Sequence, residues 1–348
     1  MVRRLLWASL ALGPLVILLH YTTDLGEETE FVLASLALIP LAWLIGEATE
    51  HASHHTGSGI GGFLNATFGN APELIIALIA VNEGLTEVVR GSLTGSVVGN
   101  LLLVLGFSLA LGGTGDLDRR STYTSLALVA LATVAFLIPS IPGWDGDPDR
   151  HSLAVISLPV SIALLAVYVA VTWLSLRRHH ELHVSDEAAA MAAWSFRSSL
   201  LVLGAATVVT AFVAEVLVGS LEVFAETLGV SDFFVAAVIV AIVGNAAEHG
   251  GAVVIARRGN LKLAAEIALA SSAQVAVFLI PAVAIISWAI EPLSLAFRPV
   301  ELIVLAVATA TTAILLRDGR STSTKGFVLI GAYMLAALAF LLVGDRDF

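Results

Sequence analysis

The sequence contains no cysteine, which excludes disulfide bonds, thiolate metal sites, iron–sulfur clusters and cysteine nucleophiles. Charged residues make up only 13%, about half of the fraction typical of soluble globular proteins. The 17 Lys and Arg against 28 Asp and Glu give a formal charge of −11, which argues against nucleic acid as a partner. By contrast, 58% of the 348 residues are hydrophobic and the mean hydropathy is +0.94. This composition indicates a protein of the lipid bilayer.

Apolar runs of about 20 residues recur along the chain, which is the length that an α-helix needs to cross about 30 Å of hydrocarbon. We therefore predict an all-α polytopic membrane protein with about eleven transmembrane helices. The expected spans are 5–22, 31–50, 58–82, 91–112, 123–139, 152–176, 196–220, 232–256, 263–288, 298–316 and 325–343. The first is interpreted as a retained helix, because no small-residue cleavage site stands near Tyr21.

The distribution of Lys and Arg predicts how these helices are oriented. With a cytoplasmic N-terminus, that face holds Arg3, Arg4, Arg119, Arg120, Arg177, Arg178, Arg197, Arg257, Arg258, Lys262, Arg317, Arg320 and Lys325. The opposite face holds only Arg90, Arg150, Arg298 and Arg346. The positive-inside rule therefore predicts a cytoplasmic N-terminus and an external C-terminus. The excess of Arg over Lys and the acidic outer loops favour a prokaryotic plasma membrane.

The chain contains an internal repeat. Residues 69–73 read GNAPE, and residues 244–248 read GNAAE, 175 positions later. The following spans also match, since GSLTGSVVGN in the first half corresponds to ALASSAQ in the second. An odd number of crossings in each unit places the second copy upside down relative to the first. The sequence thus predicts two inverted five-helix repeats and one extra N-terminal helix.

This reading divides the chain into an N-terminal helix (1–30), a first repeat (31–176), a linker (177–195) and a second repeat (196–348). We expect the polar linker to form a short helix at the cytoplasmic surface. It serves either as a plain connection or as a regulatory segment that senses cations through Glu181, Asp186, Glu187 and its histidines.

Glu73 and Glu248 are the sharpest functional candidates. An ionised carboxylate near the bilayer centre costs about 2.5–3.5 kcal/mol on insertion scales, and neither span carries a central Lys or Arg to neutralise it. Gly69 and Pro72 in one copy and Gly244 in the other disfavour a regular helix. Broken helices at membrane depth expose backbone carbonyls that can coordinate an ion.

Other oxygen-bearing side chains accompany the two glutamates. They are Asn70, Asn245, Ser96, Asn100, Ser271 and Gln274, and the first two are expected on the same helical face as their glutamates. This set suits Ca²⁺, which takes about 6–8 oxygen ligands, better than a transition metal. Two carboxylates without a cation cannot both stay ionised cheaply, so protons and Ca²⁺ are expected to exclude each other. Ca²⁺ is then the transported substrate, and no cofactor is expected.

The segments GGFLNATFGN and GNAPELIIALIA, with FFVAAVIVAIVGNAAEH and ALASSAQVAVFLIP, resemble the paired repeats of the cation/proton exchanger family, which are Ca²⁺/H⁺ antiporters of the cation/Ca²⁺ exchanger superfamily. The resemblance covers about residues 31–343. It implies that Glu73 and Glu248 bind Ca²⁺ and carry protons by alternating access. Two features depart from the family pattern, a linker that is less acidic and Pro72 where Thr is common.

Two other functions remain open at this point. One is a Na⁺-coupled Ca²⁺ exchanger, although such proteins usually carry Ser or Thr-Ser and Pro around the repeat acid. The other is a membrane-embedded zinc hydrolase that uses His51, His54 and His55 beside Glu50, although the chain has no HExxH motif. Asp145, Asp147 and Asp149 imitate the start of an EF-hand loop, but the later positions do not fit. Gly91, Gly95 and Gly99 predict a ridge for close helix packing.

Overall fold

A computed structural model describes residues 2–56, 64, 67–179 and 194–344 of the chain. The first half contains α1 (Val2–Ser9), α2 (Leu12–Thr22), α3 (Glu27–His54), α5 (Ala71–Asn82), α6 (Thr86–Val98), the π-helical segment η1 (Gly99–Val104), α7 (Leu105–Gly112), β1 (Gly115–Asp116), α8 (Arg119–Gly143) and α9 (His151–His179). The predicted linker helix falls largely on residues 180–193, outside the described residues.

The second half repeats this order of helices. It contains α11 (Phe196–Gly219), α12 (Leu221–Leu228), α13 (Asp232–Phe234), η2 (Val235–Val240), α14 (Ala241–Gly244), α15 (Ala246–Arg257), α16 (Leu261–Gln274), η3 (Val275–Leu279), α17 (Ile280–Ile286), η4 (Ser287–Ala289), α18 (Pro299–Leu315), β2 (Arg320–Ser321) and α19 (Ser323–Val343). The two short strands pair antiparallel, with Gly115 opposite Ser321.

The predicted all-α membrane architecture is confirmed. Within the described residues, eight helices are long and apolar enough to cross a membrane, and each coincides with an expected span. The other three expected spans are shorter or interrupted. The span 58–82 is represented by α5, the span 232–256 is broken between α14 and α15, and α18 has only 17 residues. Two of these three spans, 58–82 and 232–256, carry the repeated motif.

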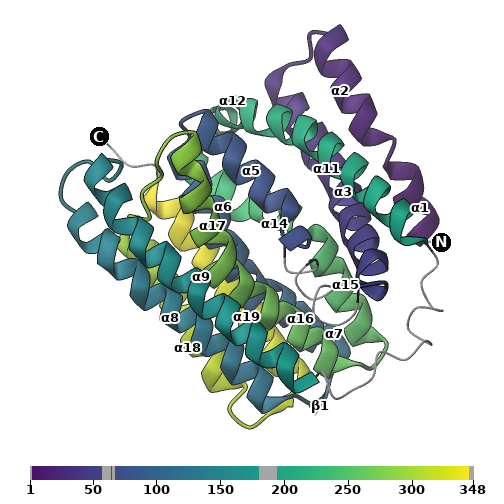
Figure 1. Ribbon diagram of the computed structural model, residues 1–348, viewed down its shortest axis with the longest axis vertical. Coiled ribbons are helices and arrows are strands. Elements are labelled where there is room, and N and C mark those ends of the chain that lie inside the picture. Colours follow the sequence, from purple (N-terminus) through teal and green to yellow (C-terminus); the bar gives the residue numbers. More distant parts are fainter. Residues whose placement is uncertain (1, 57–63, 65–66, 180–193, 345–348) are drawn as a thin grey trace.

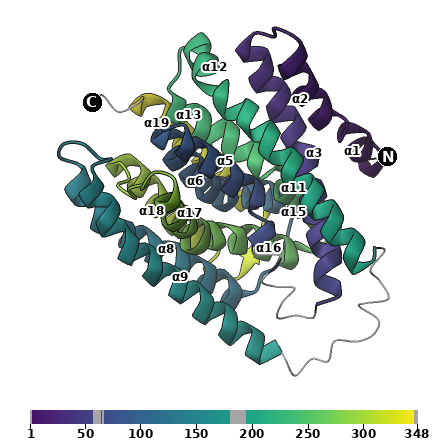
Figure 2. The ribbon, with the colours of Figure 1, turned by 45° about the horizontal axis from the view of Figure 1, so that its top comes forward.

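The helices lie in three groups (Figures 1 and 2). On one side, α3 and α11 pack along each other, with α1 and α2 outside them. On the opposite side, α8, α9 and α18 form an outer layer. Between these groups lie α5, α6, α15 and α16. The span α6–η1–α7 is the most enclosed, since 72% of its apolar window is buried against 28% for α19.

Glycine allows the central helices to approach closely. A Cβ atom at Gly95 would lie 2.0 Å from the carbonyl oxygen of Ala237, and one at Gly91 would lie 2.8 Å from that of Phe233. The backbone of α6 therefore packs directly on α13 and η2. The predicted ridge is correct for these two residues but wrong for Gly99, where a Cβ atom would meet nothing within 4 Å. Gly99 instead begins the wider π-helical turn of η1.

Two of the three π-helical segments in the described chain follow the repeat. Segment η1 begins at Gly99 and η3 begins at Val275, directly after Gln274, so that both start next to a candidate site residue. Isolated π-helical turns are rare and occur mostly at functional sites, because the extra residue displaces the side chains around it. The inverted copies thus share this irregular backbone as well as their glutamates.

Candidate ion-binding site

Both glutamates lie in the first turn of a helix that follows a backbone break. Asn70 has φ −99° and ψ 19° and precedes α5, while Asn245 has φ −87° and ψ 6° and separates α14 from α15. Glu73 and Glu248 are each the third residue of the new helix. A carboxylate is favoured there, because the unpaired N–H groups give a helix N-terminus a partial positive charge.

One expectation for this region is wrong. Pro72 does not distort a continuous helix but stands in the first turn of α5, where its missing N–H is not needed. Asn70 and Asn245 stand directly before the first residues of α5 and α15, three positions ahead of their glutamates. The broken backbone itself is as predicted.

Hydrogen bonds between the two halves bring most of the candidate residues together. The Nδ2 atom of Asn245 donates to Oγ of Ser96 at 2.9 Å. The Nδ2 atom of Asn100 donates to Oδ1 of Asn245 at 3.2 Å and to Oγ of Ser271 at 3.0 Å. Ser271 in turn donates to the carboxylate of Glu248. A single chain of polar contacts therefore connects α6 and η1 with α15 and α16.

A second contact joins the halves on the side of Glu73. The Nδ2 atom of Asn70 donates to Oε1 of Gln274 at 3.5 Å. The Glu73 side chain lies against Gly244, where an added Cβ atom would be 3.3 Å from Cγ of Glu73. Gly244 therefore leaves room for the carboxylate, whereas Gly69 lies in the turn before Asn70. All ten candidate residues lie within the described chain.

Some buried side-chain oxygen atoms of the site accept no hydrogen bond within the described structure. Within the described structure, Oε2 of Glu73 and Oδ1 of Asn100 are buried and have no hydrogen-bond partner. Glu73 is 7% exposed and Asn100 is 0% exposed, while Glu248 and Gln274 are half-buried. Leaving a buried acceptor unpaired costs about 1–3 kcal/mol. Such hard oxygen donors next to two carboxylates match the coordination preference of Ca²⁺.

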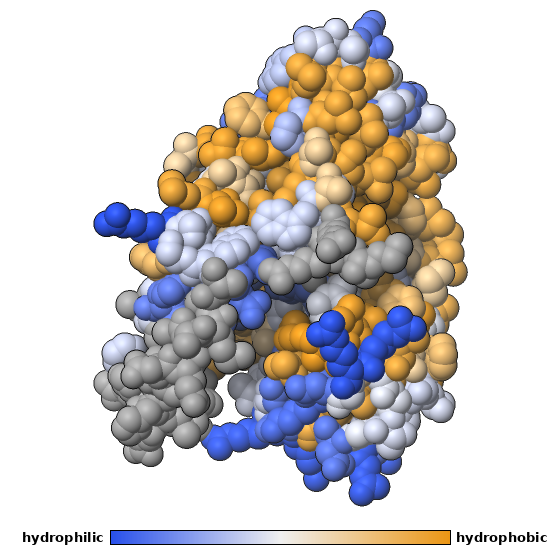
Figure 3. Space-filling model, turned by 90° about the vertical axis from the view of Figure 1, so that its right-hand side faces the viewer, coloured by the Kyte–Doolittle hydropathy of each residue, from blue (hydrophilic) through white to orange (hydrophobic). Residues whose placement is uncertain are grey.

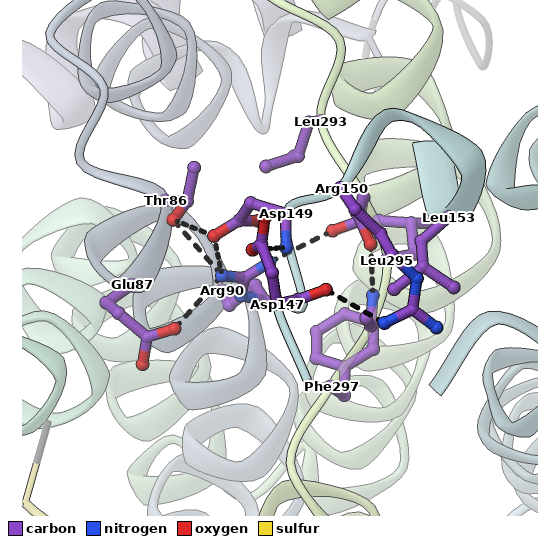
Figure 4. Close-up of polar contacts among 12 residues, drawn as sticks. Thr86, Glu87, Arg90, Asp147, Asp149, Arg150, Leu153, Leu293, Leu295 and Phe297 are labelled. Carbon is purple, nitrogen blue, oxygen red and sulfur yellow. Dashed lines mark hydrogen bonds and ion pairs between the residues drawn. The ribbon is translucent and has the colours of Figure 1, made fainter. Parts of the chain in front are cut away.

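A group of buried charged residues connects one end of α6 with the opposite layer (Figure 4). From the sequence, these residues are expected only at the outer face. Arg90 is 1% exposed, and its guanidinium bonds both oxygens of Asp149 at 2.8 and 3.0 Å. It also donates to Glu87 at 3.0 Å, and Glu87 pairs with Arg298. Asp149 thus has a structural role, in agreement with the rejection of an EF-hand. The signal available in the sequence was an arginine near the start of an apolar span.

The histidines near the end of α3 do not assemble a zinc site. His51 is 3.7 Å from Glu47 and His54 is 3.9 Å from Glu50, each one helical turn away. His55 bonds the carbonyl oxygen of Trp194 at 2.8 Å. No group of three His, Cys, Asp or Glu residues that could hold a metal ion is found in the described chain. The zinc-site hypothesis is therefore wrong for these residues.

Comparison with known proteins places the chain in a family. The family model described as sodium/calcium exchanger protein matches residues 30–177 and 198–342. A Ca²⁺/H⁺ antiporter of Synechocystis is 37% identical over 342 residues, which cover 90% of this chain and 91% of the relative. The Ca²⁺/H⁺ antiporter ChaA of Bacillus subtilis is 38% identical over 324 residues, covering 90% of this chain and 92% of the relative.

The solved structures agree. Native YfkE is 34% identical and superimposes with a TM-score of 0.81 over 98% of this chain and 100% of that one. The H⁺/Ca²⁺ exchanger CAX shares the fold with a TM-score of 0.76, covering 98% of this chain and 92% of that one, at 17% identity. The chain therefore belongs to the sodium/calcium exchanger protein family, within which its relatives at 34–38% identity include Ca²⁺/H⁺ antiporters.

Proposed function

We propose that this protein exchanges Ca²⁺ for H⁺ across a membrane by alternating access, and that Glu73 and Glu248 bind the two kinds of ion in turn. The observation that carries the proposal is the pair of carboxylates in matching first turns of α5 and α15, beside the buried, unbonded oxygens of Glu73 and Asn100. Relatives named as Ca²⁺/H⁺ antiporters over about 90% of the chain support it.

The chemistry follows from charge balance. A divalent cation neutralises both carboxylates, and Asn100, Ser271 and the carbonyls at the breaks offer further oxygen atoms for its coordination. Without the cation, the two carboxylates repel each other, so the site takes up protons instead. Ca²⁺ and protons neutralise the same site and replace each other there. Transport of Ca²⁺ in one direction is therefore coupled to transport of protons in the other.

The inverted repeat supports the alternating-access part of the proposal. Each half supplies one break and one glutamate, and the polar contacts cross between the halves. A site at such an interface can open to either face when one half rocks against the other. Export of Ca²⁺ against a 100 mV negative-inside potential costs about 4.6 kcal/mol from voltage alone. Two or more returning protons per Ca²⁺ remove this opposition.

The orientation belongs to the same proposal. Arg119, Arg120 and Lys262 lie at the end of the molecule that carries β1 and β2, whereas Arg90 and Arg298 at the other end are buried in ion pairs. The basic end is expected to face the cytoplasm. The N-terminus is then cytoplasmic and the C-terminus external, in a prokaryotic plasma membrane.

The test is ⁴⁵Ca²⁺ uptake into proteoliposomes under an imposed pH gradient, with and without a Na⁺ gradient. The wild type is compared with Glu73→Gln and Glu248→Gln, and with Glu222→Gln as a matched control, because Glu222 is an exposed glutamate in the first turn of α12. We expect uptake driven by pH alone, abolished by either site substitution and retained in the control. Uptake that requires Na⁺ would support the sodium-coupled alternative, and uptake that survives both site substitutions would refute the proposed site.

A further inference from the structure

Two adjoining hollows run along the outer face of α8. The first is an open hollow of about 600 Å³ that is lined by α8 alone, with Arg119, Arg120 and Tyr123 at its end near β1 and Leu131 farther along the helix. The second has a volume of about 390 Å³ and lies between α8 and α18, which are side by side in Figures 1 and 2. Tyr123 and Ala127 line both hollows, so the two adjoin at these residues and are together called the groove.

Small side chains create the deeper part of this groove. Ala127 and Ala130 on α8 face Ala306, Ala310 and Ala313 on α18. Their short side chains leave open the space between the two helices that larger apolar side chains would occupy. The groove is therefore an apolar furrow that opens toward the surrounding lipid.

The length of the furrow matches half a bilayer. From Tyr123 to Val134 the lining extends over eleven residues, which corresponds to about 16 Å at about 1.5 Å per residue. One leaflet contributes about half of the 30 Å hydrocarbon core. A single acyl chain that starts near Tyr123 would thus end close to Val134.

Charge at the mouth of the groove favours an anionic occupant. Arg119 and Arg120 are exposed, and within the described chain neither forms an ion pair, while Arg119 donates a hydrogen bond to the carbonyl oxygen of Arg317. The acidic residues of this end already have cations of their own, since Asp118 pairs with Lys262 at 3.1 Å and Asp318 pairs with Lys325 at 2.6 Å. Hydrophilic side chains gather at this lower end of the molecule in Figure 3.

We propose that the groove binds one anionic phospholipid, from the leaflet that faces Arg119 and Arg120. The two guanidinium groups hold the phosphate of the headgroup, for which their planar N–H donors are well suited. The Tyr123 ring lies at the level between headgroup and hydrocarbon, where tyrosine is favoured. One acyl chain occupies the furrow between α8 and α18.

The experiment is native mass spectrometry of the full-length, delipidated protein, titrated with phosphatidylglycerol or with phosphatidylcholine that has the same acyl chains. The variants are the double substitution R119Q/R120Q and the groove-filling substitution Ala310→Leu. A matched control is R257Q/R258Q, because these exposed arginines at the end of α15 do not line either hollow. Melting curves confirm that each variant is folded.

We expect R119Q/R120Q to weaken the first phosphatidylglycerol site about 30-fold, the factor that corresponds to about 1 kcal/mol per arginine, and to leave phosphatidylcholine binding unchanged. Ala310→Leu should weaken both lipids. Equal retention of phosphatidylglycerol by the wild type and R119Q/R120Q would overturn the proposal, as would an equal loss in the control. If Ala310→Leu instead abolishes an oligomer and lipid binding is unaffected, a second copy of this chain occupies the groove. Competition by soluble glycerophosphate would show that the arginines bind free phosphate without a lipid.

Discussion

The two repeats share a backbone plan but differ in the charges that fasten their ends. Glu87 is the second residue of α6 and Lys262 is the second residue of α16, in the same 175-residue register as Glu73 and Glu248. Each of them pairs with a residue of the opposite half that directly precedes a helix. Glu87 pairs with Arg298 before α18, and Lys262 pairs with Asp118 before α8. The arrangement is repeated while the signs of the charges are exchanged.

The burial of these two ion pairs also differs. The side chains of Arg298 and Glu87 are 7% and 14% exposed, and Arg90 adds a further buried cation. The side chains of Lys262 and Asp118 are 56% and 35% exposed. Removal of one partner of a buried pair leaves an uncompensated charge, whereas water replaces a lost partner at an exposed pair. We conclude that ion pairs stabilise the end of the molecule with Arg90 more strongly than the other end, where the pairs are more exposed.

The largest expected effect comes from breaking the buried group. Arg90→Gln removes the cation that Asp149 binds and one of the two cations that Glu87 binds, and we expect it to lower the free energy of unfolding by about 3–5 kcal/mol. Lys262→Gln, which breaks the ion pair at the exposed end, should have little effect. Thermal unfolding in detergent measures both. Similar losses in the two variants would contradict the contrast between the ends.

The second effect concerns the packing of α6, for which the repeats also differ. Gly95→Ala places a Cβ atom against the backbone of Ala237 and should destabilise the protein by about 3 kcal/mol. Gly99→Ala is the matched control, because a Cβ atom there meets nothing within 4 Å. The same melting assay checks both variants. A Gly95→Ala protein as stable as the wild type would show that α6 does not pack as described.

The third effect distinguishes the two serines of the site. Ser271 donates to Glu248, whereas Ser96 accepts from Asn245. Ser271→Ala therefore removes a hydrogen bond to a charged group, and we expect the KM for Ca²⁺ to change about tenfold, the equivalent of about 1.4 kcal/mol. Ser96→Ala should change it less. Initial rates of ⁴⁵Ca²⁺ uptake over a range of Ca²⁺ concentrations decide the order, and a larger effect at Ser96 would reverse the assignment.

The smallest effect concerns the exposed pair. The backbone N–H of Ser121 and the Lys262 ammonium hold the pKa of Asp118 below its ordinary value. Its stabilising contribution is therefore present above the unfolded pKa of about 3.9 and is lost as the pH falls through the lower folded value. Asp118→Asn should reduce the melting temperature slightly at pH 7, and the difference from the wild type should disappear in acid. A difference that grows in acid would mean that the sign is wrong.

Part of the site could be predicted because the repeat is visible in the chain. The motifs around Glu73 and Glu248 indicated two broken helices, and the backbone at Asn70 and Asn245 agrees. The binding roles of the ten residues stay a prediction. The role of Gly99 could not be predicted. Glycines three or four residues apart indicate close helix packing, and this pattern does not tell a regular helix from a π-helical one.

The buried charges show the same limit. Arg90 and Asp149 are 59 residues apart, and the sequence assigned both to the outer face without pairing them. Only the approach of the loop between α8 and α9 to the start of α6 brings the two charges together (Figure 4). Similarly, the groove beside Tyr123 exists because small residues of α8 and α18 face each other, and these helices lie far apart in the chain.

The sequence by itself determined that this protein is an all-α membrane protein with two copies of an acidic motif, because hydrophobic length and internal repetition are properties of the chain alone. The tertiary structure decided which oxygens meet around Glu73 and Glu248, which arginines are buried in ion pairs and which remain at the surface. These properties depend on contacts between distant segments. Helix packing, which sets those contacts, depends on side-chain shape and not on the hydrophobic pattern.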